Sequence, residues 1–339
     1  MKLIPVAKAV GMVLGHDVTE IVPGRFKGPA FKRGHVIRPE DVDRLRDLGK
    51  ENIAALELGP GWVHEDDAAR RLATVAAGAG ISLSPPCEGK VSLTATRDGL
   101  LKIDVSRLNN INAIPDIMMA TLHTHQLVTA GRVVAGTRII PLTIQNETLE
   151  AAEAQCGPAD PVVSIRPVRP HRVGLVTTGS EVYHQRIEDR FGPVVREKIA
   201  ALGSRMLRQI YVPDDIPMTV AAIEALIAEG AQIVLITGGM SVDPDDLTPG
   251  SIRATGAEVI TYGAPVLPGA MFMLAYLKGL PIVGLPGCVM YHATSIFDLV
   301  LPRILAGERL TRHDIIALGH GGLCLGCADC RYPACGFGK

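Results

Sequence analysis

Apolar runs and amphipathic segments alternate through the second half of the chain. Each amphipathic segment repeats apolar residues every three or four positions, which is the spacing of one helical face. The last run, IVLI, is apolar at every position, as expected of a strand that is covered on both faces. In chain order, the runs and segments are 172–178, 193–203, 206–212, 216–230 and 232–236. Strand, helix, strand, helix, strand predicts a parallel sheet with right-handed crossovers.

The pattern continues with two more strand-like runs, 257–263 and 280–287, and with a closing helix at 289–305. The first part of the chain is less regular. Residues 90–105 read as a hairpin with a turn near the sequence RDG, and residues 64–78 read as a helix. We therefore expect a mixed α+β domain followed by an α/β domain with a mostly parallel sheet.

Four prolines mark the boundary between the two parts, in the segment GPADPVVSIRPVRP. Proline removes a backbone donor and holds the chain extended. The predicted organisation is an N-terminal domain at 1–156, a linker at 157–170, a second domain at 171–310 and a cysteine-rich tail at 311–339. A length of 339 residues suits two domains of roughly 100 to 200 residues each.

Charge and hydropathy exclude several classes of partner. Thirty-four basic and thirty-five acidic side chains give a net charge of -1, so no field over the whole molecule would collect nucleic acid or an anionic membrane. Hydrophobic residues make up 47% of the chain, yet no apolar stretch reaches the roughly 18 residues that would span a bilayer. The segment MKLIPVAKAV has no export signal. We expect a cytoplasmic protein with a small-molecule partner.

Glycine-bearing loops follow three of the strand candidates, at 177–181, 237–241 and 284–288. In an open parallel sheet, ligands bind at the carboxyl ends of the strands. Glycine lets the backbone approach a ligand closely. Its N–H groups, together with nearby threonine and serine hydroxyls, can hold phosphate or the polar edge of a ring. The alternative is that the glycines simply end their strands.

Three aspartates follow the second glycine loop: Asp243, Asp245 and Asp246. Carboxylates would repel an anionic ligand unless a divalent cation lay between them, and Mg²⁺ is typically held by one or two carboxylates plus substrate phosphates. Glu181 in the first loop would add a carboxylate from the neighbouring strand end. In the alternative, the aspartates merely begin a short helix that Thr248 caps and that has a proline in its first turn.

The motifs occur in a specific order: TGSE after the first strand, then TGGMSVDPDDLTP, then PVLPG, and GLPGC before the last helix. In this order, residues 171–308 resemble the Mog-type domain, the molybdopterin-binding domain shared by molybdopterin adenylyltransferases and molybdopterin molybdenumtransferases. The resemblance implies a three-layer αβα fold that binds the pterin dithiolate, its phosphate or its adenylated form.

The resemblance also implies roles for individual residues. Glu181 matches a glutamate that lies near metal or molybdate, and Asp246 matches the acid of a D-x-T-P element, with Asp243 as a further candidate acid. These three are the implied catalytic residues. The implied ligand-binding residues are Thr178, Gly179, Ser180, Gly238, Gly239, Ser241, Asp245, Thr248, Pro286 and Gly287.

Several positions depart from the family pattern. Ala270 replaces a lysine expected to hold an anion, Cys288 with the following valine replaces Asn-Pro, and Ser180 stands where molybdenumtransferases usually have aspartate. Residues 1–156 lack the family's Ser-Ala-Met-Asp-Gly signature, and the usual C-terminal β domain is missing. The chain therefore reads as a divergent member, which favours binding over catalysis.

Histidines in the first half carry weaker signals. The segment HEDDAA at 64–69 has a single histidine without H-E-x-x-H spacing, which favours an exposed helix start over a metal site. His123 and His125 are two residues apart, so they point to different helical faces and read as surface or core polar residues.

The tail GLCLGCADCRYPACGFGK carries a C-x2-C-x2-C-x4-C pattern in Cys324, Cys327, Cys330 and Cys335. Four thiolates could hold tetrahedral zinc, while the first three have the spacing of iron–sulfur loops. Gly, Asp and Arg separate the cysteines, so apolar packing does not explain them. We expect a metal site, iron–sulfur or zinc, with a redox or flexible interaction tail as the alternative.

The leading hypothesis is a molybdenum-cofactor biosynthesis protein, a transferase that binds molybdopterin or its adenylate with Mg²⁺ and assists adenylation or molybdate insertion. ATP and molybdate would be further partners. The second hypothesis is a non-catalytic carrier or sensor that docks a molybdoenzyme or a maturation partner through the cysteine tail. A third is a nucleotide-cleaving enzyme, because the competence and damage-inducible family has a similar element. Relatives on this fold commonly assemble, so we expect a homo-oligomer.

Overall fold

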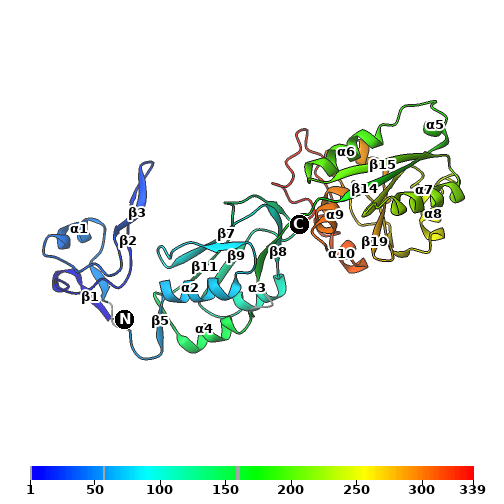
Figure 1. Cartoon of the computed structure of the whole chain (residues 1–339). Helices are drawn as coiled ribbons and strands as arrows, with labels where there is room; N and C mark the ends of the chain where they lie inside the picture. Colours follow the sequence, from blue (N-terminus) through cyan, green and yellow to red (C-terminus); the bar gives the residue numbers. More distant parts are fainter. Residues whose placement is uncertain (1, 56–57, 158–160) are drawn as a thin grey trace. The chain divides into compact units, whose positions relative to one another are not determined.

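The chain folds into two compact units (Figure 1). The computed structural model describes residues 2–55, 58–157 and 161–339. The first unit comprises residues 1–124 and 128–166, and the second comprises residues 125–127 and 167–339. The stretch expected to be a linker contains strand β13 (Val163–Arg166), which pairs with a strand of the first unit. Residues 158–160 of that stretch lie outside the described residues.

The first unit begins with a small lobe, residues 2–55, which has its own apolar core. Its outer strands pair antiparallel, and a hairpin and a short helix lie between them in the chain. Its core includes Leu14, Ile37, Leu45 and Ile53, each 1% exposed. The elements are β1 (Lys2–Pro5), η1 (Val6–Lys8), β2 (Val18–Val22), β3 (Phe26–Phe31), α1 (Asp41–Asp47) and β4 (Asn52–Ala55).

The rest of the first unit is a mixed α+β lobe, as the sequence predicts. One antiparallel sheet has the strand order β6-β7-β11-β9, and a second sheet has the order β10-β8-β13. The elements are β5 (Trp62–His64), α2 (Glu65–Ala76), β6 (Ile81–Leu83), β7 (Lys90–Ala95), β8 (Gly99–Ile103), α3 (Val105–Asn112), β9 (Ile117–Thr121), β10 (Leu127–Val128), β11 (Val133–Ile139), β12 (Thr143–Gln145) and α4 (Asn146–Glu153).

The hairpin predicted at 90–105 is wrong in its pairing. The two strands are present as β7 and β8, but they belong to different sheets. Strand β7 pairs with β6 and β11, and strand β8 pairs with β13. The two strands therefore pair with other strands and not with each other, and the turn between them leads from one sheet to another.

Helix α2 begins at a cluster of charged side chains. His64 caps the helix by accepting a hydrogen bond from the backbone N–H of Asp66, so this segment is a helix start, as expected, but the expected exposure is wrong. His64 is buried, at 1% exposure, and its ring also hydrogen-bonds the carbonyl oxygen of Gly15 in the N-terminal lobe. Arg33 of the same lobe pairs with Asp66 at 3.2 Å. The helix start thus joins the two lobes of the first unit.

Glu65 at this helix start makes the first unit sensitive to pH. Burial, together with the charge of Asp66, raises the pKa of Glu65 to about 7, although Arg138 lies 3.5 Å away. The folded state therefore holds this proton more tightly than the unfolded state does. Stability from this group is present below about pH 4.5 and is lost as the pH rises to about 7.

We expect Glu65→Gln to raise the free energy of unfolding at pH 8 by about 2 kcal/mol, and to change it little at pH 4.5, because the amide needs no proton in the folded state. Urea unfolding of the first unit at both pH values measures the difference. Glu40→Gln, at an exposed position, is the control. The same pH dependence in wild type and Glu65→Gln would contradict the assignment.

Six strands of the second unit, all within residues 167–339, form one sheet with the order β15-β14-β16-β19-β18-β17. Neighbours from β15 to β19 run parallel, and β18 runs antiparallel to both of its neighbours. The sheet is therefore mostly parallel, as predicted. The strands are β14 (Arg172–Thr178), β15 (Arg205–Val212), β16 (Ile233–Thr237), β17 (Glu258–Tyr262), β18 (Met273–Leu277) and β19 (Leu280–Leu285).

Helices cover both faces of this sheet, which gives the three-layer αβα fold (Figure 1). One apolar core joins α6 and α9 to one face, and the other core joins α7 and α8 to the opposite face. Gly174 in β14 allows a close approach, since a Cβ there would lie 2.9 Å from the side chain of Leu226. The helices are α5 (Ser180–Tyr183), α6 (Phe191–Ala201), α7 (Ile216–Ala228), α8 (Thr248–Ala254), α9 (Ile296–Leu305) and α10 (Arg312–Ala317).

The closing helix is shorter than the predicted 289–305. Residues 287–290 form the 3-10 turn η2 (Gly287–Met290), and helix α9 begins only after Ser295. Ser295 and Asp298 form a capping box. The Ser295 side chain accepts a hydrogen bond from the backbone N–H of Asp298, and the Asp298 side chain accepts one from the backbone N–H of Ser295, which sets the start of the helix. In the described part of the chain, no helix is both long and apolar enough to cross a membrane.

Candidate functional site

Loops after the parallel strands β16 and β19 enclose a cavity of about 470 Å³. The sequence-predicted residues that line it are Gly238, Gly239, Ser241, Asp246, Pro286 and Gly287. Further lining comes from Phe191, Met240, residues 267–271, Leu285 and Cys288. The structure thus brings the second and third glycine loops to one site at the carboxyl end of the sheet.

The glycine turn of the second loop is built on positive backbone angles. Gly238 and Gly239 have φ values of 87° and 53°, which lie in the left-handed region that side chains disfavour. A Cβ on Gly238 would lie 2.2 Å from the carbonyl oxygen of Thr178 at the end of β14. The loops that follow β14 and β16 are therefore in direct backbone contact, and only glycine fits at position 238.

Thr178 and Thr248 support this turn from behind the cavity. The Thr248 hydroxyl donates to the carbonyl oxygen of Gly238 at 2.8 Å and lies 3.2 Å from the Thr178 hydroxyl. Both threonines are buried, with 5% and 1% exposure, and both lie outside the cavity lining. Their hydroxyls are thus used within the protein. Helix α8 begins at Thr248, so the three aspartates lie in the turn before the helix rather than in it.

The three aspartates differ in their surroundings. Asp246 lines the cavity, and its carboxylate accepts a hydrogen bond from the backbone N–H of Asp243 at 3.1 Å. The backbone N–H of Asp246 in turn donates to the carbonyl oxygen of Asp243 at 2.9 Å. Asp243 and Asp245 are exposed and lie outside the lining. Only one carboxylate of this cluster therefore reaches the cavity among the residues that the structure describes.

The first glycine loop makes its own contacts beside the cavity. Glu181 is exposed on the one-turn helix α5, and its carboxylate lies over Gly179, 3.0 Å from where a Cβ would stand. Ser180 donates its backbone N–H and its hydroxyl to Asp214, at 2.9 and 3.0 Å. Gly179, Ser180 and Glu181 lie outside the lining of the cavity that contains Asp246.

Two acids that the sequence reasoning missed hold this end of the sheet together. Asp214 follows β15 and fixes Ser180, as described above. Asp189 accepts hydrogen bonds from the backbone N–H of Phe191 at 2.8 Å and from the Gln209 side chain at 2.6 Å. It thereby positions Phe191 at the cavity. A local signal in the sequence could have identified Asp189, because an aspartate just before a helical pattern commonly caps that helix.

The cavity contains one formal charge. Among the described residues, Asp246 is the one charged side chain in its lining, and Ala270 occupies the position where the resemblance implies a lysine. Cys288 also lines the cavity, and burial raises the pKa of its thiol, which keeps it protonated at neutral pH. An anionic ligand in this cavity would therefore meet backbone amides and one negative carboxylate, without a side-chain cation.

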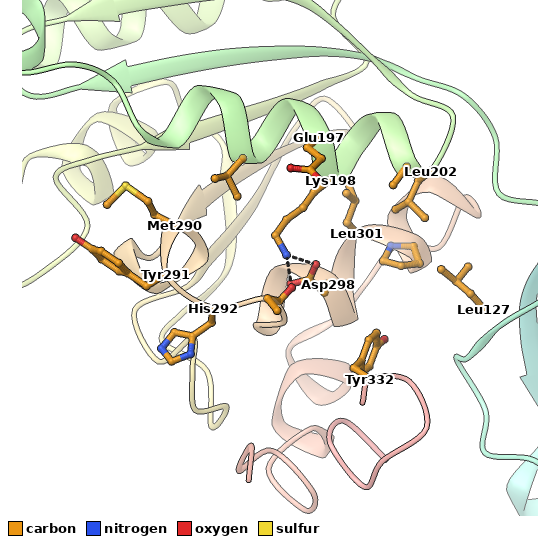
Figure 2. A pocket seen from close by; sticks show the side chains of 14 residues that line it. Leu127, Glu197, Lys198, Leu202, Met290, Tyr291, His292, Asp298, Leu301 and Tyr332 are labelled. Atoms are coloured by element: carbon orange, nitrogen blue, oxygen red, sulfur yellow. Dashed lines mark hydrogen bonds and ion pairs between the residues drawn. The ribbon is translucent and has the colours of Figure 1, made fainter. Parts of the chain in front are cut away.

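The segment after η2 leads to a second cavity, of about 510 Å³, shown in Figure 2. There the Lys198 ammonium donates to Asp298 at 2.6 Å and to the carbonyl oxygen of Ala293 at 2.7 Å. Asp298 also caps helix α9. Lys198 points at these partners in the close view, with Tyr291 and His292 beside them. We read this cavity as a structural seam between α6 and α9, because the half-buried charges of Lys198 and Asp298 are paired with each other.

The four tail cysteines line a third cavity, of about 250 Å³, together with His292 and Thr294. Among residues 2–55, 58–157 and 161–339, however, no three His, Cys, Asp or Glu side chains are arranged as ligands of one metal ion. The cysteines make separate contacts: Cys324 through its backbone, Cys330 through the Thr294 hydroxyl and Cys335 by packing on the core.

Comparison with known proteins places residues 174–306 in a family described as "Probable molybdopterin binding domain". Residues 3–57 match a second family, described as a domain of unknown function. The second unit therefore contains a Mog-type domain, which confirms the resemblance. The N-terminal lobe corresponds to the second match.

Individual relatives match this domain only in part. A CinA-like protein of a Mycobacterium species (strain MCS) is 36% identical over 91 residues, which are 26% of this chain and 21% of that protein. A molybdopterin adenylyltransferase of Pyrococcus furiosus is 29% identical over 92 residues, 27% of this chain and 54% of that protein. The solved molybdopterin biosynthesis enzyme MoaB of Thermus thermophilus is 20% identical, with a TM-score of 0.33, over 41% of this chain and 98% of that one.

Proposed function

We propose that the cavity beside Asp246 binds molybdopterin or its adenylate, and that the protein acts in molybdenum-cofactor biosynthesis. The family match supports the ligand class, and relatives named for this pathway support the process. The observation that carries the proposal is the cavity itself. It combines a glycine turn with a single carboxylate at the carboxyl end of a parallel sheet, where ligands bind in such folds.

The proposed reaction is Mg²⁺-dependent adenylation or molybdate insertion, with ATP or molybdate as co-substrate. One carboxylate plus substrate phosphate oxygens is coordination that Mg²⁺ accepts, so the lining fits the ion only when the ligand is present. When bound there, Mg²⁺ would neutralise the phosphate and polarise a phosphoryl or oxo group. Asp246 would hold the ion, while Gly238, Gly239 and Ser241 would contact the ligand. Glu181 and Asp243 lie outside the cavity lining and are proposed as further acids of the reaction.

Asp246→Asn tests the proposal through its dependence on Mg²⁺. With Mg²⁺ present, we expect the variant to bind molybdopterin about tenfold more weakly, because the carboxylate that holds the ion is lost. Without Mg²⁺, we expect equal or tighter binding, since a charge that repels the phosphate is gone. Isothermal titration with purified molybdopterin measures both.

The matched control is Asp47→Asn, which removes the same charge from an exposed position in the N-terminal lobe. A wild-type protein that does not bind molybdopterin would refute the proposed function. Equal Mg²⁺ dependence in wild type and Asp246→Asn would refute the assigned role of Asp246.

A non-catalytic carrier is the second candidate, and Ala270 favours it. This residue lines the cavity where the family resemblance implies a lysine, so a cation expected to act on the ligand's anion is missing. A turnover assay with Mg²⁺, ATP and molybdate separates the two functions. A carrier would bind molybdopterin and form no product.

A further inference from the structure

The cysteine tail forms a closed loop on the second unit. Leu323, near its start, forms an isolated β-bridge with Leu267 in the cavity loop. The backbone N–H of Leu267 donates to the carbonyl oxygen of Gly322, and the carbonyl oxygen of Leu267 accepts a hydrogen bond from the backbone N–H of Cys324, both at 2.8 Å. At the far end, the Gly338 N–H donates to the carbonyl oxygen of Gly321 at 2.9 Å. Phe337 anchors this end in the core, at 4% exposure. The two ends of the segment 321–338 therefore lie next to each other, and the four cysteines lie in the loop between them.

Within this loop, all four thiols reach the wall of one cavity of about 250 Å³. Cys324 and Cys335 are half-buried and pack against the core beside Tyr332, while Cys327 and Cys330 are exposed. Thr294 holds the Cys330 sulfur at 3.3 Å. The loop thus has an inner and an outer pair of thiols, one pair on the core and one toward solvent.

The spacing of the cysteines decides between metal types. Structural zinc sites commonly draw their ligands from separated C-x2–4-C pairs rather than from one continuous run of three cysteines. A [4Fe–4S] cluster gives each thiolate an iron of its own, so its ligands stand around a larger body. The C-x2-C-x2-C run is also the spacing of cluster-binding loops.

We propose that Cys324, Cys327, Cys330 and Cys335 bind a [4Fe–4S] cluster in this cavity. The four thiols lose their protons on binding and supply the cluster's four protein ligands. This site is separate from the proposed pterin cavity and does not depend on pterin binding. Leu267 nevertheless lines the pterin cavity and pairs with the tail, so the two sites share one support.

The test is elemental analysis of the full chain purified without oxygen. We expect about four irons and about four acid-labile sulfides per chain, with visible absorbance that dithionite bleaches. In Cys327→Ala we expect less than about a tenth of this iron, because an exposed ligand is removed with little change in packing. Cys87→Ala, an exposed cysteine of the first unit, is the matched control and should keep the full content.

The wild-type analysis alone can overturn the proposal, whether or not a variant folds. One zinc per chain without sulfide would replace the cluster by a mononuclear site, and the absence of both metals would exclude a metal at this loop. Iron that stays in Cys327→Ala would exclude this ligand set. Circular dichroism of Cys327→Ala shows whether a loss of iron is separate from a loss of fold.

Discussion

Gly238→Ala is expected to destabilise the second unit by about 3 kcal/mol or more and to abolish ligand binding at the adjoining cavity. The residue has a φ of 87°, so any side chain is strained there. The added Cβ would also lie 2.2 Å from the carbonyl oxygen of Thr178. Thr178 cannot move aside easily, because β14 is paired with strands on both of its sides. The loop of Gly238 must therefore shift, and the cavity changes shape.

Gly256→Ala separates the cost of backbone strain from the cost of the close contact that the added Cβ makes. Gly256 has a similar φ of 78°, but no atom lies within 4 Å of its added Cβ. This control should therefore cost only about 1 kcal/mol of backbone strain and leave binding intact. Urea unfolding and titration with molybdopterin measure both variants. If the two alanines were equally destabilising, the contact between the loops after β14 and β16 would not be the cause.

Local patterns predicted the second unit well, because its strands and helices follow one another in sequence. The apolar run of β16 is buried at every position between two helical layers, as expected of a strand that is covered on both faces. Strand β18 was missed for a related reason. Its residues are also apolar throughout, and a short apolar run does not distinguish a buried strand from a buried helix.

Pairing partners could not be predicted where they are distant in sequence. Residues 90–105 have the pattern of a hairpin, yet β7 pairs with β11 and β8 pairs with β13, more than thirty residues farther along. The free energy gained by burial against these distant partners outweighs the advantage of a hairpin, which is the small entropic cost of closing the short loop between β7 and β8. Alternation fixes which residues face inward, but it does not fix which neighbour a strand chooses.

The candidate site was predictable in its glycines and less so in its polar side chains. Gly238 and Gly239 were identified because glycine lets the backbone approach a ligand closely, and in the structure both also have positive φ. The hydroxyls of Thr178 and Thr248 looked equally suited to a ligand, but the structure uses them to hold the glycine turn. Whether a polar group faces a cavity or a neighbour depends on tertiary contacts, which spacing alone does not contain.

A buried arginine on α9 supports the other end of the second unit. Arg303 is 4% exposed and donates to Glu308 at 2.8 Å and to Asp314 at the start of α10. Burial alone would raise the pKa of Asp314, but hydrogen bonds from Thr311 and Arg303 outweigh it and hold that pKa well below its usual value. The stability that Asp314 contributes is therefore present above about pH 4 and is lost as the pH falls further.

Arg303→Met is expected to lower the free energy of unfolding by about 3 kcal/mol at pH 7, because it removes the buried cation that pairs with both Glu308 and Asp314. The loss should be smaller at pH 3, because carboxylates of the unfolded state take up protons below about pH 4, so the pairing of Asp314 contributes less stability there. Urea unfolding at the two pH values measures this change. Arg208→Met, which breaks an exposed pair with Glu229, should cost less than about 1 kcal/mol.

The double variant Arg303→Met with Glu308→Gln gives the decisive comparison. Removing both charges should recover part of the stability lost in Arg303→Met, since an uncompensated buried charge costs more than an absent pair. Because Arg303 joins α9 to α10, and α10 leads into the cysteine tail, the single variant should also loosen the tail. A loss that is the same at pH 3 and pH 7, or no recovery in the double variant, would assign the effect to packing rather than to charge.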